Sequence, residues 1–165
     1  MAALNIGDTA PDFEVPAVTG EKRHKFKLSD YRGKKHVILA FYPLDWSPAW
    51  STHVPAYNTD LEKFAGYDAQ VVGMSVDSIP SHIAWQQKSI GMLNYPLGSD
   101  FWPHGAVAEK YGVLRTGEPI PGMSERALFI VDKDGKLVFG KVYDIGEHPN
   151  NEECFEVLRK LQLAA

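Results

Sequence analysis

Two short apolar runs constrain the fold of this chain more than any other feature. Residues 36–42 and residues 69–77 contain several β-branched side chains and are bounded by glycine, proline or charged residues, which is typical of buried strands. Between them, Tyr57, Leu61 and Phe64 repeat at spacings of four and three, the pattern of one helix face. A strand, a helix and a second strand at this spacing predict a βαβ unit with parallel strands and a right-handed crossover.

Two hairpins are expected on either side of this unit. Residues 13–18 and 26–28 carry apolar side chains around a turn that begins at Gly20. Residues 127–131 and 137–142 are joined by Asp-Lys-Asp-Gly-Lys, a strong hairpin-turn signal. Each pair therefore predicts two antiparallel strands.

Three further helices complete the expected fold. They are predicted at residues 78–91, at residues 107–112 and from residue 150 or 151 onward. Together with the strands they predict an α/β protein whose mixed central sheet is flanked by helices on both faces. No linker or repeat interrupts the pattern, so we expect a single domain over residues 1–165.

Composition excludes several classes of function. The formal net charge of −4 leaves no broad basic surface, so a nucleic-acid partner is not expected. No apolar run approaches the length of about 20 residues that a membrane-spanning helix needs. The first residues lack the basic and apolar regions of a signal peptide, from which we expect a cytoplasmic location. Cys154 is the only cysteine, so a reductase that uses a pair of cysteines is excluded.

The segment that follows the first apolar run is the expected functional site. Ser47 and Pro48 form the pattern of a helix N-cap with proline at the first helical position. This pattern places a helix N-terminus just beyond the carboxyl end of a central strand, where open α/β sheets bind their ligands. Backbone N–H groups at such a terminus favour an anion or a thiolate.

This segment resembles the site of the peroxiredoxins, which have Pro-x-x-x-Thr/Ser-x-x-Cys, commonly with Glu three residues further on. Pro43 and Ser47 match this motif. Trp50 stands where the peroxide-attacking cysteine is expected, and His53 stands where Glu is common.

Other motifs carry the resemblance over residues 4–161, nearly the whole chain. In order along the chain they are Gly7-Asp-Thr-Ala-Pro-Asp-Phe13, Leu28-Ser-Asp-Tyr-Arg-Gly-Lys34, Ser99-Asp100, Tyr111-Gly-Val113 and an arginine, Arg126, before the third buried strand. The run Phe-Trp-Pro-His-Gly-Ala-Val at residues 101–107 is similar to the one-cysteine, AhpE-like branch of the family.

The resemblance implies a thioredoxin-like fold and a thiol-dependent reduction of hydrogen peroxide and organic hydroperoxides. Such a protein needs an external thiol reductant and no metal, haem or flavin, and it commonly forms a homodimer. By resemblance, Ser47 would hydrogen-bond the peroxide, Arg126 would stabilise the thiolate and the transition-state charge, and Pro43 would shield the site from water.

Trp50 conflicts with that activity. An indole has one weakly acidic N–H donor and no thiolate-like nucleophile, so we expect the chain to be inactive as a thiol peroxidase at position 50. Both a natural loss of the cysteine and an engineered replacement account for this pattern, and His53 is a possible second modified position. The alternative function is a non-catalytic interaction or ligand-binding module, with Trp46, Trp50 and Trp102 as an aromatic contact surface. A redesigned pocket built on Trp50 and His53 is a weaker third idea.

Several of these residues also have a simpler interpretation. His53 is more commonly a surface or hydrogen-bonded histidine than a ligand, and the histidines show no metal-ligand spacing. Cys154 is expected to be a small buried residue rather than a resolving thiol. Arg126 would otherwise form a surface salt bridge. The aromatic residues Trp46, Phe101 and Trp102 are expected in the core or on a dimer face.

Overall fold

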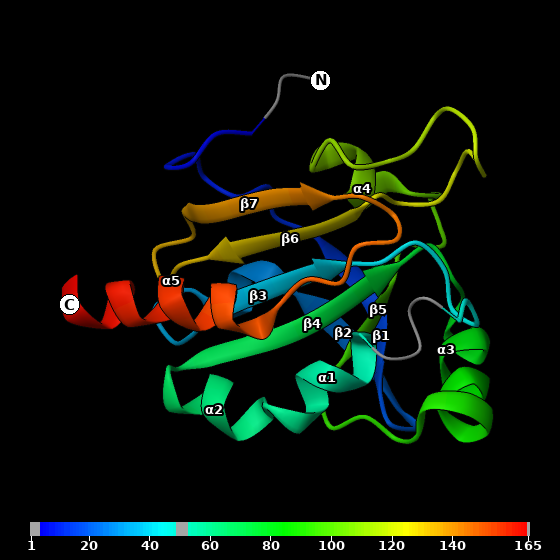
Figure 1. Cartoon of the computed structure of the whole chain (residues 1–165), viewed down its shortest axis with the longest axis horizontal. Helices are drawn as coiled ribbons and strands as arrows, with labels where there is room; N and C mark the ends of the chain where they lie inside the picture. Colours follow the sequence, from blue (N-terminus) through cyan, green and yellow to red (C-terminus); the bar gives the residue numbers. More distant parts are fainter. Residues whose placement is uncertain (1–3, 49–52, 165) are drawn as a thin grey trace.

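The computed structural model describes residues 4–48 and 53–164. Their strands form one seven-stranded sheet in the order β2-β1-β5-β4-β3-β6-β7 (Figure 1). The strands are β1 (Glu14–Thr19), β2 (Lys22–Lys27), β3 (His36–Phe41), β4 (Ala69–Ser75), β5 (Leu97–Ser99), β6 (Arg126–Val131) and β7 (Leu137–Tyr143).

The predicted βαβ unit lies in the middle of this sheet. β3 and β4 pair in parallel, from His36 opposite Ala69 to Phe41 opposite Met74. β6 lies on the other side of β3 and runs antiparallel to it. The sheet is therefore mixed, as the sequence predicts.

Both predicted hairpins are present at the edges of the sheet. β1 and β2 pair antiparallel along their whole length. β6 and β7 also pair antiparallel, with a shift of register between Ile130 and Val131. The turn between them contains Gly135 at a φ of +79°, a conformation that glycine adopts without steric cost.

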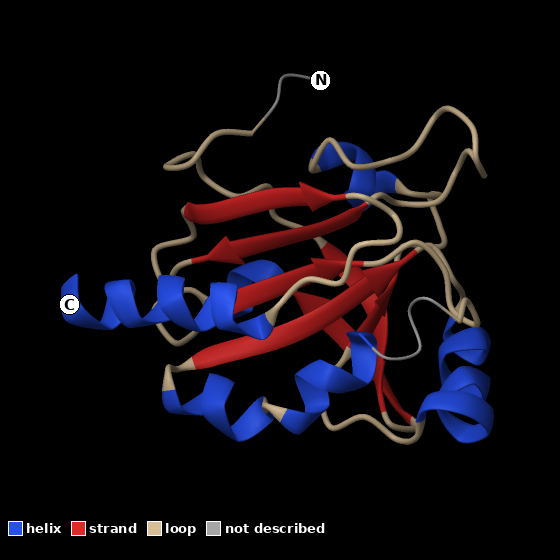
Figure 2. Cartoon of the chain, in the orientation of Figure 1, coloured by secondary structure: helices blue, strands red, loops and turns tan. Residues whose placement is uncertain are grey.

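Helices cover both faces of the sheet (Figure 2). They are the 3-10 turn η1 (Leu28–Tyr31), α1 (His53–Thr59), α2 (Leu61–Gly66), α3 (Ile79–Trp85), the π-turn η2 (Gln86–Ile90), α4 (Ala106–Lys110) and α5 (Asn151–Ala164).

Alternating side chains of the strands supply two hydrophobic layers. One layer joins Ile38 of β3 to apolar residues of α1, α2, α3 and α5, among them Tyr57 and Phe155. The other joins Leu39 to β1, β2 and α4, among them Phe13 and Val107. This alternation along β3 explains why the strand is apolar throughout rather than at every second position. The expected helices on both faces are confirmed.

The helix after the site segment differs from the prediction. The prediction of a single helix that is capped by Ser47 and continues to Phe64 is wrong in two respects. Pro48 lies in a turn, and the described part of α1 begins only at His53. The helix is then interrupted at Asp60, whose backbone lies at φ −100° and ψ 12°. There the Asn151 side chain donates a hydrogen bond to the Asp60 carboxylate at 2.9 Å, a contact with α5 that local periodicity does not encode.

The next helix follows its predicted signals closely. Ser78 is the N-cap of α3, and its hydroxyl accepts a hydrogen bond from the backbone N–H of Ser81. Proline follows at the start of the helix, where its missing N–H costs no hydrogen bond. The π-turn η2 extends the helix to Gly91 at a φ of +85°. α5 likewise begins at Asn151 as predicted.

None of the helices formed by residues 4–48 and 53–164 is long and apolar enough to cross a bilayer.

Candidate active site

The predicted site residues Pro43 and Ser47 lie on the loop that follows the carboxyl end of β3. Pro43 is buried and Ser47 is partly exposed. The loop begins at Tyr42, whose backbone carbonyl accepts a hydrogen bond from the Ser124 hydroxyl at 2.9 Å. Trp50, the predicted position of the missing nucleophile, lies outside the described residues.

Arg126 is the first residue of β6, the antiparallel neighbour of β3. Because Phe41 of β3 faces Ala127 of β6, the register brings Arg126 beside the start of the site loop. The pairing of β3 with β6 therefore brings the motif residues Pro43 and Ser47 and the predicted arginine to the same end of these two strands. These residues are far apart in the sequence, and only the fold brings them together.

The surroundings of Arg126 are those of an interior group. Its side chain is fully buried, and one guanidinium nitrogen, Nη1, donates to the backbone carbonyl of Glu147. Burial lowers the pKa of Arg126 to about 10, which leaves it a cation at neutral pH. The alternative interpretation as a surface salt bridge is wrong.

A shallow apolar hollow of about 380 Å³ adjoins the loop. Pro43 and Ser47 line it on one side, and Ile120, Met123 and Ile145 line it on the other. Its size is within the range of small-molecule sites. Arg126 is not among the residues that line it.

His53 differs from its expected surface or hydrogen-bonded state. The side chain is 5 % exposed, and neither ring nitrogen has a hydrogen-bond partner among residues 4–48 and 53–164. Its ring packs edge-on against Tyr57, with the centroids 4.9 Å apart. Burial, and then the positive charges of Arg126 and His148, lower the pKa of His53 to about 3. His53 is therefore a neutral imidazole at physiological pH.

A buried polar network that no local sequence pattern predicts is centred on the same loop. Asp45 lies between Pro43 and Ser47, and its carboxylate accepts hydrogen bonds from three side chains. The donors are the Tyr42 hydroxyl at 2.7 Å, the Ser81 hydroxyl at 2.9 Å and His82 Nδ1 at 2.8 Å. The one local signal was an acidic residue in an otherwise apolar stretch.

Comparison with known proteins places this arrangement in a family. The model of the AhpC/TSA family matches residues 6–139. The chain belongs to the AhpC/TSA family. It is 39 % identical over 162 residues to a chloroplastic 2-Cys peroxiredoxin of Spinacia oleracea, covering 95 % of this chain and 59 % of the spinach protein. It therefore spans less than two thirds of that relative's length.

Two further relatives agree with this assignment. Peroxiredoxin-2 of Cricetulus griseus is 38 % identical over 169 residues, covering 98 % of this chain and 81 % of the hamster protein. The reduced 2-Cys peroxiredoxin of Plasmodium vivax superposes with a TM-score of 0.88 at 27 % identity, covering 96 % of this chain and 82 % of that one. The peroxiredoxin assignment and the thioredoxin-like fold are thus confirmed. The spinach and Plasmodium vivax relatives carry 2-Cys names, and the likeness to the AhpE-like branch stays a prediction.

The single cysteine of this peroxiredoxin is a structural residue. Cys154 lies in α5 with no exposed surface. Burial, with the negative charge of Glu153 as the second cause, raises the pKa of its thiol to about 12. The thiol is therefore protonated at neutral pH and inaccessible, as expected for a small buried residue. Residues 4–48 and 53–164 contain no cluster of three histidine, cysteine or acidic side chains that could hold a metal ion.

The aromatic residues that were expected in the core or on a dimer face are exposed in the single chain. Trp46 is 47 % exposed, Phe101 55 % and Trp102 82 %. A core role is therefore wrong for all three.

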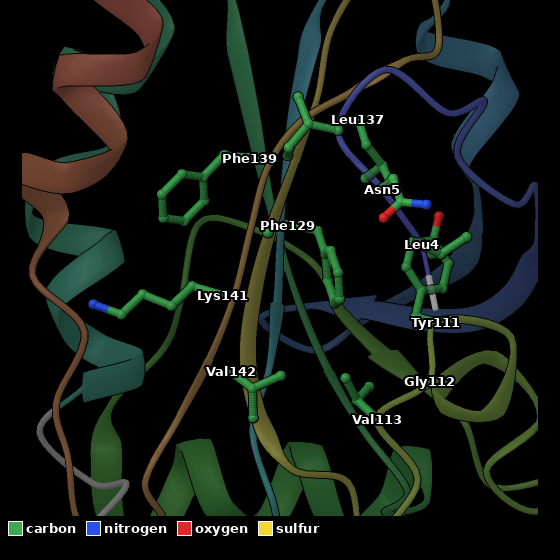
Figure 3. Close-up of a pocket in the computed structure, with 12 residues that line it drawn as sticks. Leu4, Asn5, Tyr111, Gly112, Val113, Phe129, Leu137, Phe139, Lys141 and Val142 are labelled. Carbon is green, nitrogen blue, oxygen red and sulfur yellow. The ribbon is translucent and has the colours of Figure 1, made fainter. Parts of the chain in front are cut away.

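A separate hollow of about 360 Å³ lies between the β6–β7 hairpin and the N-terminal residues Leu4, Asn5 and Ile6 (Figure 3). Phe129, Val113 and Tyr111 surround it, whereas Lys141 extends away from them. It contains none of the predicted site residues and is not part of the peroxiredoxin site.

Proposed function

We propose that this peroxiredoxin keeps the surroundings of a peroxide site but lacks its nucleophile, and that it does not reduce hydroperoxides as the sequence stands. The active form would take a hydroperoxide as substrate and an external thiol as reductant. Trp50 replaces the group on which the chemistry depends, and no metal or organic cofactor is part of the proposed reaction.

The proposed chemistry explains why one substitution is enough. In an active peroxiredoxin a thiolate sulfur attacks one peroxide oxygen, the O–O bond breaks, and the departing oxygen takes up a proton and leaves as an alcohol or water. The cysteine becomes a sulfenic acid, which two external thiols return to the thiol with release of water and a disulfide. A tryptophan cannot take part in either step.

The observation that carries the proposal is the state of Cys154. It is the only thiol in the sequence, it is a buried residue of α5, and its pKa is raised to about 12. It therefore cannot replace a thiolate at position 50. The proposal is supported by the position of Pro43 and Ser47 just after the carboxyl end of β3, and by the position of Arg126 at the start of the neighbouring strand β6.

The test compares three proteins in a stopped-flow assay of peroxide consumption with excess dithiothreitol. These are the chain itself, its Trp50→Cys variant and a Trp102→Cys variant. Trp102→Cys is the matched control, because it adds a thiol at a position that is 82 % exposed and is not one of the predicted site residues. We expect rapid consumption of hydrogen peroxide and cumene hydroperoxide by Trp50→Cys alone.

Two results would contradict the proposal. Rapid consumption by the unchanged chain would show that Trp50 does not prevent the reaction. Equal, slow rates for Trp50→Cys and Trp102→Cys would show that the surroundings of the site are not preserved.

We also propose that the protein forms a homodimer through β7. This strand lies at one edge of the sheet, and Val142 in it is 56 % exposed. An unpaired edge offers backbone donors and acceptors to a second strand. The opposite edge, β2, carries Lys22, Arg23, Lys25 and Lys27, and like charges oppose its pairing with a copy of itself.

Light scattering after size exclusion tests the dimer. We expect a mass twice that of the chain, and a shift to the single-chain mass in a Val142→Lys variant, with Lys25→Glu as the control at the other edge. A dimer that Val142→Lys leaves intact would exclude the β7 edge.

A further inference from the structure

The loop that carries Pro43 and Ser47 is fixed from within by Asp45. The residue is 5 % exposed although its neighbour Trp46 points into solvent. Its carboxylate accepts three side-chain hydrogen bonds, and its backbone N–H donates to Asp77 Oδ2 at 2.8 Å. These contacts tie the loop to α3 and to the segment after β4, which lie beside it in Figure 1.

His82 is the central donor of this network, and the geometry fixes its protonation. Nδ1 lies 2.8 Å from Asp45 Oδ2, and Nε2 lies 3.0 Å from the backbone carbonyl oxygen of Gly98. A backbone carbonyl oxygen and an ionised carboxylate accept hydrogen bonds and cannot donate them. A neutral imidazole carries a proton on only one nitrogen, so it would leave one of these contacts as a close approach of two acceptors.

The remaining neighbours lead to the same conclusion. The Tyr42 hydroxyl lies 3.4 Å from Nδ1, but it donates its own proton to Asp45 Oδ1. The Ser81 hydroxyl also donates to Asp45. With three donors directed at it, the Asp45 carboxylate is the charged partner of an imidazolium.

We propose that His82 is doubly protonated at neutral pH and that Asp45 and His82 are a positioning pair, which holds the site loop in the conformation that forms the peroxide pocket. Loss of the His82 proton, or of either side chain, frees the loop while the sheet stays folded. The role in the pocket rests on the proposed function, whereas the protonation and the hold on the loop do not.

The titratable groups that face His82 support a positive charge there. They are Asp45 on the site loop, Asp77 after β4 and Tyr42 at the end of β3. Burial opposes the imidazolium, but the hydrogen bond and charge of Asp45 outweigh it, so the pKa of His82 is raised. Burial, together with the nearby charge of Asp45, raises the pKa of Asp77.

The first test is nitrogen-15 NMR of the unchanged protein, with the histidine rings labelled. We expect the His82 ring to show protons on both nitrogens at pH 7 and to lose one as the pH rises. A single proton on the ring at pH 7 would overturn the proposal. This measurement needs no variant and does not depend on activity.

The second test follows the loop by hydrogen exchange. The Asp45 amide is the probe, since its only described acceptor is Asp77. We expect protection, corrected for intrinsic exchange, to fall by about tenfold or more in His82→Gln and Asp45→Asn, while amides of α5 keep theirs. His24→Gln, at an exposed histidine of β2, is the matched control. Equal protection in His82→Gln and His24→Gln would overturn the proposal.

The third test joins the loop to the site in the Trp50→Cys background. We expect the added His82→Gln change to lower the rate of peroxide consumption. We also expect the rate of Trp50→Cys to fall at alkaline pH, as His82 loses its proton. The double variant should lack this pH dependence. If Trp50→Cys is inactive, the proposed function fails while the first two tests still decide the pair. If it is active and His82→Gln leaves its rate and pH profile unchanged, the positioning role is wrong.

Discussion

Two buried histidines, His82 and His53, differ in their hydrogen bonding and in the direction of their pKa shifts. His82 has a hydrogen-bond acceptor at each ring nitrogen, one of them a carboxylate, and its pKa is raised. His53 has no hydrogen-bond partner in the part of the chain that the structure describes, lies near the Arg126 cation, and has a pKa lowered to about 3. The contrast shows that burial alone does not set the charge of a histidine, because the neighbouring groups decide it.

The same contrast extends to two tyrosines. Tyr42 belongs to the network around Asp45 and donates to it at 2.7 Å. Tyr57 packs on His53, and its buried hydroxyl has no hydrogen-bond partner within the described residues. In the region around Asp45 the buried polar groups are hydrogen-bonded to one another. In the region around His53 two polar rings pack against each other without hydrogen bonds from described residues. Substitutions should therefore be costly in the first region and mild in the second.

Asp45→Ala is the largest expected effect. It would leave an imidazolium buried without its carboxylate, and removing one partner of a buried pair costs about 3–5 kcal/mol. Urea denaturation at pH 7 measures the loss in the free energy of unfolding. A loss below about 1 kcal/mol would show that His82 is not charged in the fold.

Acidification should act on the His53 region next. Because the folded pKa of about 3 lies below the ordinary value near 6.5, the unfolded chain binds the proton more tightly. The contribution of His53 to stability is complete above pH 6.5 and is lost as the pH falls towards 3, by roughly 2–4 kcal/mol. Denaturation curves between pH 7 and pH 4 should show this loss in the unchanged chain.

A His53→Leu variant separates this histidine from the other acid-sensitive groups. We expect it to be less acid-sensitive than the unchanged chain and to lie within about 1 kcal/mol of it at pH 7, because the ring makes no hydrogen bond there. An identical pH dependence in the two proteins would contradict the low pKa of His53.

Tyr42→Phe and Tyr57→Phe form a matched pair of smaller changes. Tyr42→Phe removes a hydrogen bond to a charged acceptor, a loss of about 1.5–3 kcal/mol. Tyr57→Phe removes a buried hydroxyl that has no partner, so its stability should be unchanged or slightly higher. Thermal unfolding of both variants ranks them, and equal losses would mean that the two regions do not differ as described.

Ser81→Ala should have the smallest effect in the network. It removes one neutral donor to Asp45 and leaves the pairing with His82 in place. We expect the free energy of unfolding to fall by about 0.5–1.5 kcal/mol. The raised pKa of His82 should persist in this variant, as measured by NMR titration. A return of that pKa to its ordinary value would assign the main role to Ser81 instead.

Much of the fold followed from local patterns. The apolar alternation of the strands, the Ser78 cap and the turn at Gly135 each act over a few residues, so the sequence carries them directly. The motif residues Pro43, Ser47 and Arg126 were also found by resemblance. Strand pairing then gave the placement of Arg126 beside the loop.

The remainder depends on contacts between distant segments. Asp45 and His82 are 37 residues apart, and no periodicity links them. The interruption of the helix at Asp60 coincides with a side chain of α5, 91 residues further along the chain. The burial of His53 has the same origin, because the packing of α1 against the sheet, and not the identity of the residue, determines its exposure.

The burial of Cys154 has a practical consequence for spectroscopy. With its sole thiol enclosed and protonated, the folded protein should be inert towards maleimides and disulfide reagents at neutral pH. Any cysteine introduced at the surface would then be the single point of attachment for a fluorophore or spin label, with no need to remove a native thiol first. The chain is in this sense a ready scaffold for measuring distances and motions one position at a time.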